Sequence, residues 1–201
     1  MILSVGLLCV SLVAAAEDSS WWLRQDVRLL RAINGIEDPI WGGLLSAANA
    51  SAYPVFLGAP LSMWATGFVR RDERWLRAGI RLALIEGVVA GAVFGLKRAI
   101  GRKRPYWVLL DLRRSPPEPS RSDSYAMPSG HAALAFAVAT GGALEARRWA
   151  VSASLYAWAA LVALARPYYG AHYPSDVIVG AALGAGLSWG VREALRHWGW
   201  P

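Results

Sequence analysis

The chain has 201 residues, of which 55% are hydrophobic and only 17% are charged. Its length favours a single domain, and its composition excludes an ordinary soluble protein, so we expect an integral membrane protein with the lipid bilayer as a partner. The formal net charge of +7 would suit nucleic acid, but all but two of the 21 basic residues are arginines, scattered between apolar stretches. No nucleic-acid-binding motif is present, so we expect no nucleic-acid partner. The single cysteine, Cys9, excludes an intramolecular disulfide and a cysteine-rich zinc site.

Residues 1–16 form an apolar run that has two interpretations. The run is short for a membrane span, and its alanines 14–16 resemble a signal-peptidase site, but no basic residue precedes it. An N-terminal transmembrane helix and a cleaved signal peptide are therefore equally consistent with it. Both place Glu17 on the outer side of the membrane, and residues 17–201 are expected to form the functional domain.

Residues 21–34 alternate apolar and charged positions at helical spacing. Arg24, Arg28 and Arg31 fall on one side of such a helix, and Trp22 lies with other apolar residues on the opposite side. This pattern predicts an interfacial helix that lies on the outer leaflet.

Five later stretches are apolar enough to be membrane spans, and all five are interpreted as helices. The first of them has no charged residue over more than the ~20 positions that a span needs, so one spanning helix is expected in its second half. The stretches are 39–69, 78–97, 129–145, 149–165 and 176–195. Glycines repeat every four residues in two of them, which lets helix backbones approach closely: Gly87, Gly91 and Gly95, and Gly180 and Gly184. The sequence thus predicts an all-α, polytopic membrane bundle of five or six transmembrane helices.

Arginines between the spans predict the orientation of the bundle. They cluster after the span at 39–69, between two later spans and at the C-terminus, and the positive-inside rule places them in the cytoplasm. The clusters are Arg70, Arg71, Arg74 and Arg77; Arg147 and Arg148; and Arg192 and Arg196. Segments 17–38, 98–128 and 166–175 then lie on the outer side, and proline-rich residues 106–127 are expected to form a loop.

The first cluster of polar residues on the outer side is Lys97, Arg104 and Pro105. Lys97 ends a span and Arg104 follows seven residues later, about two helical turns, so both cations would point to one place if the segment stays helical. The alternative is that both side chains reach toward lipid headgroups, which is common at the ends of spans.

The second cluster, residues 128–131, has the sequence Pro-Ser-Gly-His and directly precedes an uncharged run. It predicts a helix N-terminus, where free backbone N–H groups and the positive end of the helix dipole favour an anion. Gly130 would let the backbone approach that anion, and Ser129 would add a hydroxyl. The alternative is that Ser129 only caps the helix and that His131 is incidental.

The third cluster begins at Arg166 and includes His172, Pro174 and Asp176. Pro174 suits the first turn of a helix, which places Asp176 in that turn and His172 just before it. Asp176 could accept a hydrogen bond from one ring nitrogen of His172 and leave the other nitrogen free as a nucleophile. The alternative, that Asp176 only complements the helix dipole, explains neither Arg166 nor His172.

The three clusters together resemble the motifs of the type 2 phosphatidic acid phosphatase (PAP2) family, an integral-membrane lipid phosphatase family. The resemblance covers roughly residues 20–195, and it depends on the order and spacing of the clusters more than on any one of them. The third histidine of the chain, His197, lies outside the motifs and is interpreted as a solvated or headgroup-facing residue. The chain departs from the family pattern at Ala165, where the family usually has a serine before the arginine.

The resemblance implies an acid phosphatase-like helical core and a set of site residues. His172 would attack phosphorus and form a phosphohistidine, Asp176 would orient it, and His131 would protonate the leaving oxygen. The phosphate oxygens would be held by Lys97, Arg104, Ser129, Gly130 and Arg166. The resemblance implies neither a metal ion nor another cofactor, because these cations would stabilise the developing charge.

The substrate implied by the resemblance is a lipid phosphate or diphosphate that enters from the membrane. Undecaprenyl diphosphate, phosphatidylglycerophosphate, phosphatidic acid and lipid A phosphate all fit, and the expected location is a bacterial inner membrane with the site facing the periplasm or exterior. The alternatives are a lipid phosphotransferase with the same phosphohistidine, a vanadate-dependent haloperoxidase, and a non-catalytic lipid-phosphate-binding protein. No oligomeric state is predicted.

Overall fold

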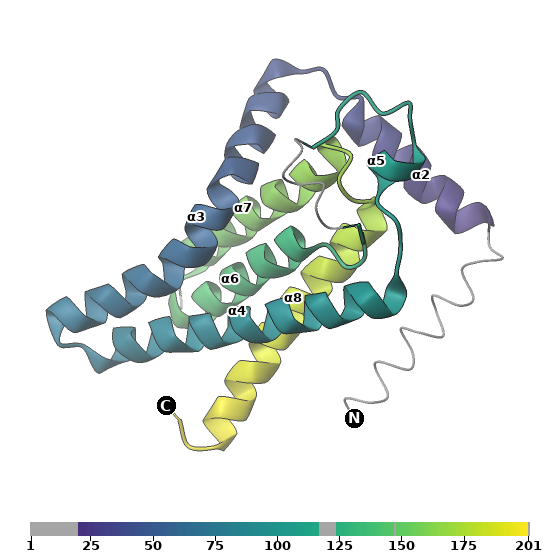
Figure 1. Cartoon of the computed structure of the whole chain (residues 1–201). Coiled ribbons are helices and arrows are strands. Elements are labelled where there is room, and N and C mark those ends of the chain that lie inside the picture. Colours follow the sequence, from purple (N-terminus) through teal and green to yellow (C-terminus); the bar gives the residue numbers. More distant parts are fainter. Residues whose placement is uncertain (1–19, 117–123, 147, 201) are drawn as a thin grey trace.

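A computed structural model describes residues 20–116, 124–146 and 148–200 (Figure 1). Within these ranges the chain is all-helical and contains no strand, as the sequence predicted. The helices are α2 (Ser20–Asn34), α3 (Pro39–Arg70), α4 (Glu73–Ile100), the short α5 (Pro105–Val108), α6 (Gly130–Ala146), α7 (Trp149–Tyr168) and α8 (Pro174–His197). The two interpretations of residues 1–16 concern a segment outside the described residues.

The first predicted span is longer than expected. We expected a spanning helix only in the second half of 39–69, but α3 is helical from Pro39 to Arg70. Asp38 starts this helix by accepting hydrogen bonds from the backbone N–H groups of Ile40 and Trp41, both at 2.9 Å, and proline is favourable at the first helical position. Two further prolines inside α3 do not end it, and a span limited to the second half of this helix stays a prediction.

Helix α6 lies at the centre of the bundle. It packs against α7 and α8 most extensively and also against α4 and α3 (Figure 1). Its buried residues are mostly small, so neighbouring helices can approach it on several sides: Ala132, Ala133, Ala135, Ala137, Val138, Ala139, Thr140, Gly141 and Gly142. The closest approach is to α8, where a Cβ atom added at Gly184 would lie 1.9 Å from the carbonyl oxygen of Ala133.

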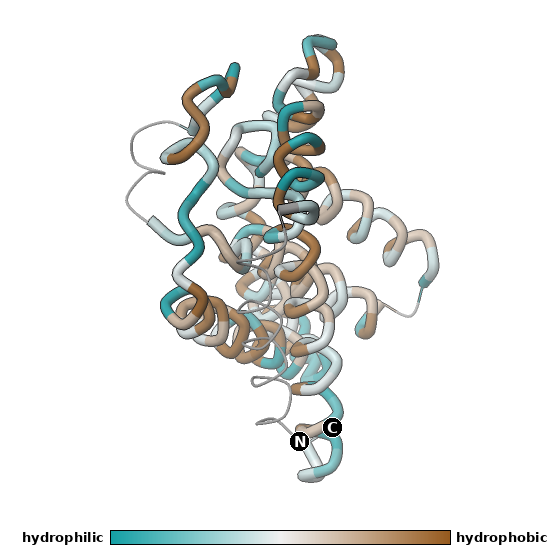
Figure 2. The backbone as a smooth tube through the Cα atoms, turned by 90° about the vertical axis from the view of Figure 1, so that its right-hand side faces the viewer, coloured by the Kyte–Doolittle hydropathy of each residue, from teal (hydrophilic) through white to brown (hydrophobic). Residues whose placement is uncertain are grey.

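The outward faces of the long helices are apolar. Large hydrophobic side chains are exposed along them, and hydrophobic stretches run through the helices while hydrophilic residues gather in the connections (Figure 2). Among the described residues, two helices, α4 and α7, are long and apolar enough by length and composition to cross a membrane. The count of five or six transmembrane helices therefore stays a prediction.

Arginines gather at one end of the bundle. Glu145, at the end of α6, forms ion pairs with Arg81 of α4 at 3.1 Å and with Arg192 of α8 at 3.6 Å, and its carbonyl oxygen accepts a hydrogen bond from Arg74 at 2.9 Å. On α8, Arg192 lies 16 residues after Asp176, or about 24 Å along a helix at 1.5 Å per residue. The arginine-rich end and the motif residues that begin α8 thus lie at opposite ends of the bundle.

The close approach at Gly184 predicts that a methyl group there will destabilise the fold. Gly184→Ala should lower stability by about 1–3 kcal/mol, because the new atom would overlap the backbone of α6. The measurement is the thermal unfolding midpoint of the purified protein in detergent. Gly186→Ala is the matched control on the same helix, because no atom lies within 4 Å of its added Cβ. Equal midpoints for the two variants would contradict this account of the packing.

Candidate active site

The chain turns sharply between Lys97 and Arg104. Helix α4 ends at Ile100, and Gly101 follows with a φ of 67°, a left-handed conformation that suits glycine. The segment between the two cations thus does not stay helical. The turn brings the chain back onto the bundle, so that Lys97 and Arg104 are both buried, with 8% and 6% of their surfaces exposed. The Lys97 ammonium donates to the carbonyl oxygen of Tyr125 at 2.7 Å.

The second motif meets the third where α6 and α8 begin. The N–H of Ser129 donates to the carbonyl oxygen of Asp176 at 3.0 Å, and a Cβ atom added at Gly180 would lie 2.5 Å from the carbonyl oxygen of Ser129. The Ser129 hydroxyl is fully buried and has no hydrogen-bond partner among the described residues. The structure therefore does not support the alternative in which this hydroxyl only caps α6.

The other two residues of the second motif differ in how tightly they are held. His131, in the first turn of α6, packs edge-on against Tyr53 of α3, with ring centroids 5.0 Å apart. A Cβ atom added at Gly130 would make only an ordinary contact, 3.6 Å from Val93. The described neighbours thus do not require glycine at position 130, and its role toward phosphate stays a prediction.

His172 lies in the loop between α7 and α8 and is almost completely buried. Gly170 turns this loop with a φ of 63°, and the Ala171 N–H closes it onto the carbonyl oxygen of Arg166 at 2.9 Å. The ring places its Nε2 atom 3.3 Å from the Arg104 guanidinium. A guanidinium carries only donors, so this contact favours the tautomer in which Nε2 is the acceptor nitrogen and Nδ1 is protonated.

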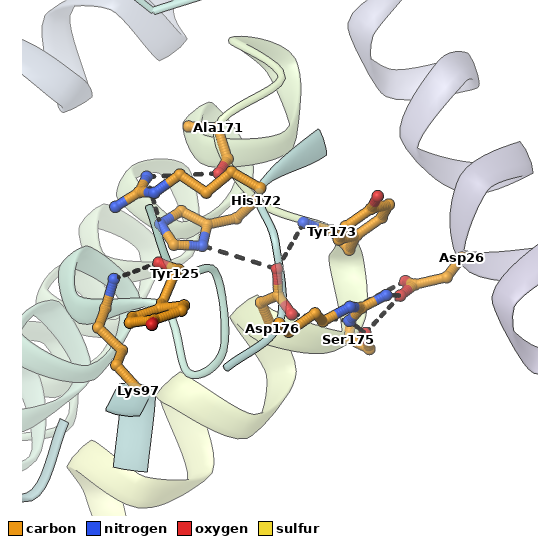
Figure 3. Close-up of polar contacts among 10 residues, drawn as sticks. Asp26, Lys97, Tyr125, Ala171, His172, Tyr173, Ser175 and Asp176 are labelled. Atoms are coloured by element: carbon orange, nitrogen blue, oxygen red, sulfur yellow. Dashed lines mark hydrogen bonds and ion pairs between the residues drawn. The ribbon is translucent and has the colours of Figure 1, made fainter. Parts of the chain in front are cut away.

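Asp176 lies behind His172, at a longer distance than the sequence suggested. Its Oδ2 atom is 3.7 Å from His172 Nδ1, which exceeds a hydrogen-bond distance (Figure 3). The closer partner of Oδ2 is the backbone N–H of Tyr173, at 2.8 Å, and Oδ1 accepts from Arg102 at 2.7 Å. Asp176 therefore faces the protonated nitrogen of His172 while other groups fix its carboxylate.

Arg166 brings a third cation to the same place. It lies in the last turn of α7, is 5% exposed, and donates to the side-chain oxygen of Asn49 on α3 at 2.5 Å. Its Nε atom is buried without a hydrogen-bond partner among the described residues. Asn49 is neutral, so this contact positions the guanidinium without compensating its charge.

The two motif histidines lie among these three cations. Lys97, Arg104 and Arg166 act electrostatically on both His131 and His172. Burial, followed by Arg104, Arg166 and Lys97, holds the pKa of His172 well below its ordinary value of 6.5. His172 is therefore neutral near pH 7, with an unprotonated Nε2 directed at the cations. Such a centre favours a bound anion and presents a nucleophile to it.

Several residues around the site were not singled out from the sequence. Asp26 of α2, Arg102, Tyr173 and Ser175 form a polar network behind Asp176, and Asn49 of α3 holds Arg166 (Figure 3 shows the network). Arg102 lies inside the first motif, between the two cations that were selected, and Asp26 is an acidic residue within the basic helix 21–34. These two positions could have drawn attention to Arg102 and Asp26, but neither position indicates which residue the side chain contacts.

Comparison with known proteins gives a family and several relatives. A model of the PAP2 superfamily matches residues 78–200, more than half of the chain. A lipid A 1-phosphatase of Porphyromonas gingivalis is 34% identical over 130 residues, which cover 64% of this chain and 26% of that protein. A lipid A 4'-phosphatase of Bacteroides thetaiotaomicron is 25% identical over 182 residues, covering 82% of this chain and 74% of the relative. The chain thus spans about a quarter of the first relative and about three quarters of the second.

Two solved structures have the same fold. The crystal structure of Aquifex aeolicus LpxE aligns with a TM-score of 0.63 and 24% identity, over 83% of this chain and 94% of that one. The crystal structure of a transmembrane PAP2 type phosphatidylglycerolphosphate phosphatase from Bacillus subtilis aligns with a TM-score of 0.68 and 23% identity, over 95% and 94%. The apolar outer surface and the two candidate spans agree with an integral membrane protein. The motifs, the helical core and the matching family model together show that this chain belongs to the PAP2 superfamily.

Proposed function

We propose that the chain is a lipid phosphatase that hydrolyses a phosphomonoester or diphosphate lipid through a phosphohistidine on His172. One observation carries the proposal: the Nε2 atom of a buried, neutral histidine is directed at Arg104 inside a group of three cations. The buried Ser129 hydroxyl and the Arg166 Nε, which have no hydrogen-bond partners among the described residues, are two donors suited to phosphate oxygens.

The proposed reaction has two displacements at phosphorus. His131 takes up a proton once the bound phosphate anion offsets the three cations. His172 Nε2 attacks, the bond between phosphorus and the lipid oxygen breaks, and His131 gives the departing oxygen that proton. His131 then accepts a proton from water, the water oxygen bonds to phosphorus, and the bond from phosphorus to nitrogen breaks to release free phosphate. During the attack Nδ1 keeps its proton, and the Asp176 carboxylate stabilises the positive charge on the ring.

The cations supply the electrostatic stabilisation of this reaction. Lys97, Arg104 and Arg166 would hold the equatorial oxygens, where negative charge concentrates in the transition state. All three are buried, so the attraction is less screened by water than at a surface. In this scheme fixed cations perform the role that a metal ion has in many other phosphatases.

The proposed substrate is a lipid phosphate on the outer side of a bacterial inner membrane. The relatives are lipid A phosphatases and one fold neighbour is a phosphatidylglycerolphosphate phosphatase, so lipid A phosphates and phosphatidylglycerophosphate are the first candidates. The site lies at the end of the bundle opposite the arginine-rich end, and the positive-inside rule would place that arginine-rich end in the cytoplasm. A bundle of five or six transmembrane helices would present the site to the periplasm.

Replacing the proposed nucleophile tests the function. His172→Gln should reduce release of free phosphate by more than about a thousandfold and abolish a trapped phosphoprotein that is stable to alkali and labile to acid. The assay uses the purified protein with lipid A 1- and 4'-phosphates, phosphatidylglycerophosphate and undecaprenyl diphosphate. His197→Gln changes an exposed histidine and is the matched control. Turnover by His172→Gln at the wild-type rate would remove His172 from the mechanism, and a phosphorylated lipid product in place of free phosphate would indicate a phosphotransferase.

The cation-based scheme makes a separate prediction about metals. Activity should persist in excess EDTA, because side-chain cations hold the phosphate, and vanadate should inhibit, because it resembles five-coordinate phosphorus. Both effects can be measured in the same phosphate-release assay. Loss of activity on chelation that is restored by one divalent cation would contradict the metal-free scheme.

The lowered pKa of His172 predicts how stability depends on pH. The unfolded chain takes up a proton on this ring as the pH falls through 6.5, whereas the folded protein does not, so the free energy of unfolding should decrease as the pH falls below 6.5. Thermal unfolding midpoints from pH 7.5 to 5 should fall less steeply for His172→Gln than for the wild type. Identical slopes for His172→Gln and the wild type would contradict the buried neutral imidazole.

A further inference from the structure

Helix α2 forms hydrogen bonds at both ends of the loop that carries His172, residues 169–173. Before His172, the Asn34 side chain donates to the carbonyl oxygen of Tyr168 at 2.9 Å. After it, Asp26 accepts from the backbone N–H of Ser175 at 2.9 Å and from its hydroxyl at 2.5 Å. Asp26 and Asn34 are both buried, and they lie eight residues apart, or about 12 Å along a helix. The helix therefore spans the loop that carries His172.

Arg102 continues this connection inward. One guanidinium nitrogen donates to Asp26 at 2.7 Å, and the other donates to Asp176 at 2.7 Å and to Ser175 at 2.7 Å (Figure 3). The guanidinium also stacks over the ring of Tyr173, 3.9 Å from its centroid. Burial lowers the pKa of Arg102, but the carboxylates of Asp176 and Asp26 outweigh it and raise the pKa above its ordinary value. The guanidinium therefore stays charged between two carboxylates.

This bridge fixes the orientation of the Asp176 carboxylate. Arg102 holds Oδ1, so the second oxygen is directed toward the Tyr173 N–H and the Nδ1 atom of His172. Rotation of the carboxylate would break the contact with Arg102 and turn Oδ2 away from the ring. Because Asp176 is fully buried, no solvent would replace the lost partners.

We propose that Asp26 and Arg102 are positioning residues that hold Asp176 against the Nδ1–H of His172 and so keep Nε2 unprotonated and aimed at the substrate. The proposal rests on the proposed function, because it assigns both residues to the same reaction. Arg102 belongs to this network and not to the phosphate group, since its guanidinium is bound by Asp26, Ser175 and Asp176. Both residues act on turnover through Asp176.

Steady-state kinetics on a lipid phosphate test the proposal. Arg102→Gln should lower kcat about a hundredfold and Asp26→Asn about tenfold, with KM changed less than about threefold, because neither residue contacts phosphate. The loss of kcat in Arg102→Lys should lie between the losses in these two variants, since an ammonium cannot bridge both carboxylates in the same way. The double variant of Asp26→Asn and Arg102→Gln should lose no more than Arg102→Gln alone, because both changes break one chain of contacts.

The matched control is Asp111→Asn. Asp111 forms an exposed ion pair with Arg31 of α2 at 2.9 Å. This change therefore removes a carboxylate partner of α2 without altering the contacts of Asp26 and Arg102. Its kcat should equal that of the wild type. A rise in KM with kcat unchanged in Arg102→Gln would overturn the positioning role and assign Arg102 to substrate binding.

The histidine tautomer provides a readout that does not need turnover. Long-range ¹H–¹⁵N spectra of ¹⁵N-histidine-labelled protein should show His172 protonated on Nδ1, with the signal assigned by its loss in His172→Gln. Arg102→Gln should give a mixture of tautomers, and Asp111→Asn should keep the wild-type spectrum. If the wild type is inactive on every lipid phosphate but has a fixed His172 tautomer that is lost in Arg102→Gln, the proposed function is refuted and the positioning role is retained. If Arg102→Gln and Asp26→Asn fold and have the kcat and the His172 tautomer of the wild type, the positioning role alone is overturned. If either variant does not fold, Arg102→Lys is measured in its place.

Discussion

The close approach of α6 and α8 is the constraint on which the site depends. A side chain at Gly184 would overlap the backbone of α6, and one at Gly180 would overlap the backbone of Ser129, directly before α6, so the two helices meet with almost no space between them. Their N-termini therefore lie together, and the N–H of Ser129 reaches the carbonyl oxygen of Asp176. Ser129 of the second motif and Asp176 of the third, 47 residues apart in the chain, become neighbours because small residues line this contact. In a membrane such packing has to come from dispersion and polar contacts, because lipid provides no hydrophobic drive between helices.

Charge is divided around His172 in a way that suits the proposed reaction. Asp176 is neutralised from behind by Arg102, which in turn is held by Asp26. Asp176 is therefore already paired with Arg102, whereas Arg166 donates to the side chain of Asn49, which is neutral. Burial of Arg166 beside a neutral partner is unfavourable without an anion, and the proposed phosphate group would supply one. The same field keeps His172 neutral, so in the proposed reaction one arrangement would both bind the anion and maintain the nucleophile.

Helix α2 connects the predicted membrane interface with the candidate site. The sequence predicted a helix at 21–34 with basic and apolar sides, and the structure has a helix from Ser20 to Asn34. Its exposed surface includes Trp21, Trp22, Leu23 and Leu29, while Asp26 and Asn34 are buried against the loop between α7 and α8. A helix suited to the lipid surface is thus joined by hydrogen bonds to the segment that carries the proposed nucleophile.

Hydrophobic stretches and short motifs were sufficient to locate the six longer helices of the described residues, the family and the three clusters, because apolar length, glycine spacing and helix-start residues are local properties of the chain. They did not predict the short α5, whose residues 106–108 fall in the segment that was expected to be a loop, and they left open whether the helix of Lys97 continues to Arg104, whereas α4 ends at Ile100. Likewise, no spacing rule relates Asp26 to Arg102, 76 positions later in the chain. The sequence by itself determined which residue types were available for phosphate chemistry and on which helix ends they lie. Only the tertiary structure decided that Arg104 faces His172 and that Arg102 neutralises Asp176. The reason is that these contacts depend on how the turn after α4 and the buried side of α2 pack against the loop before α8.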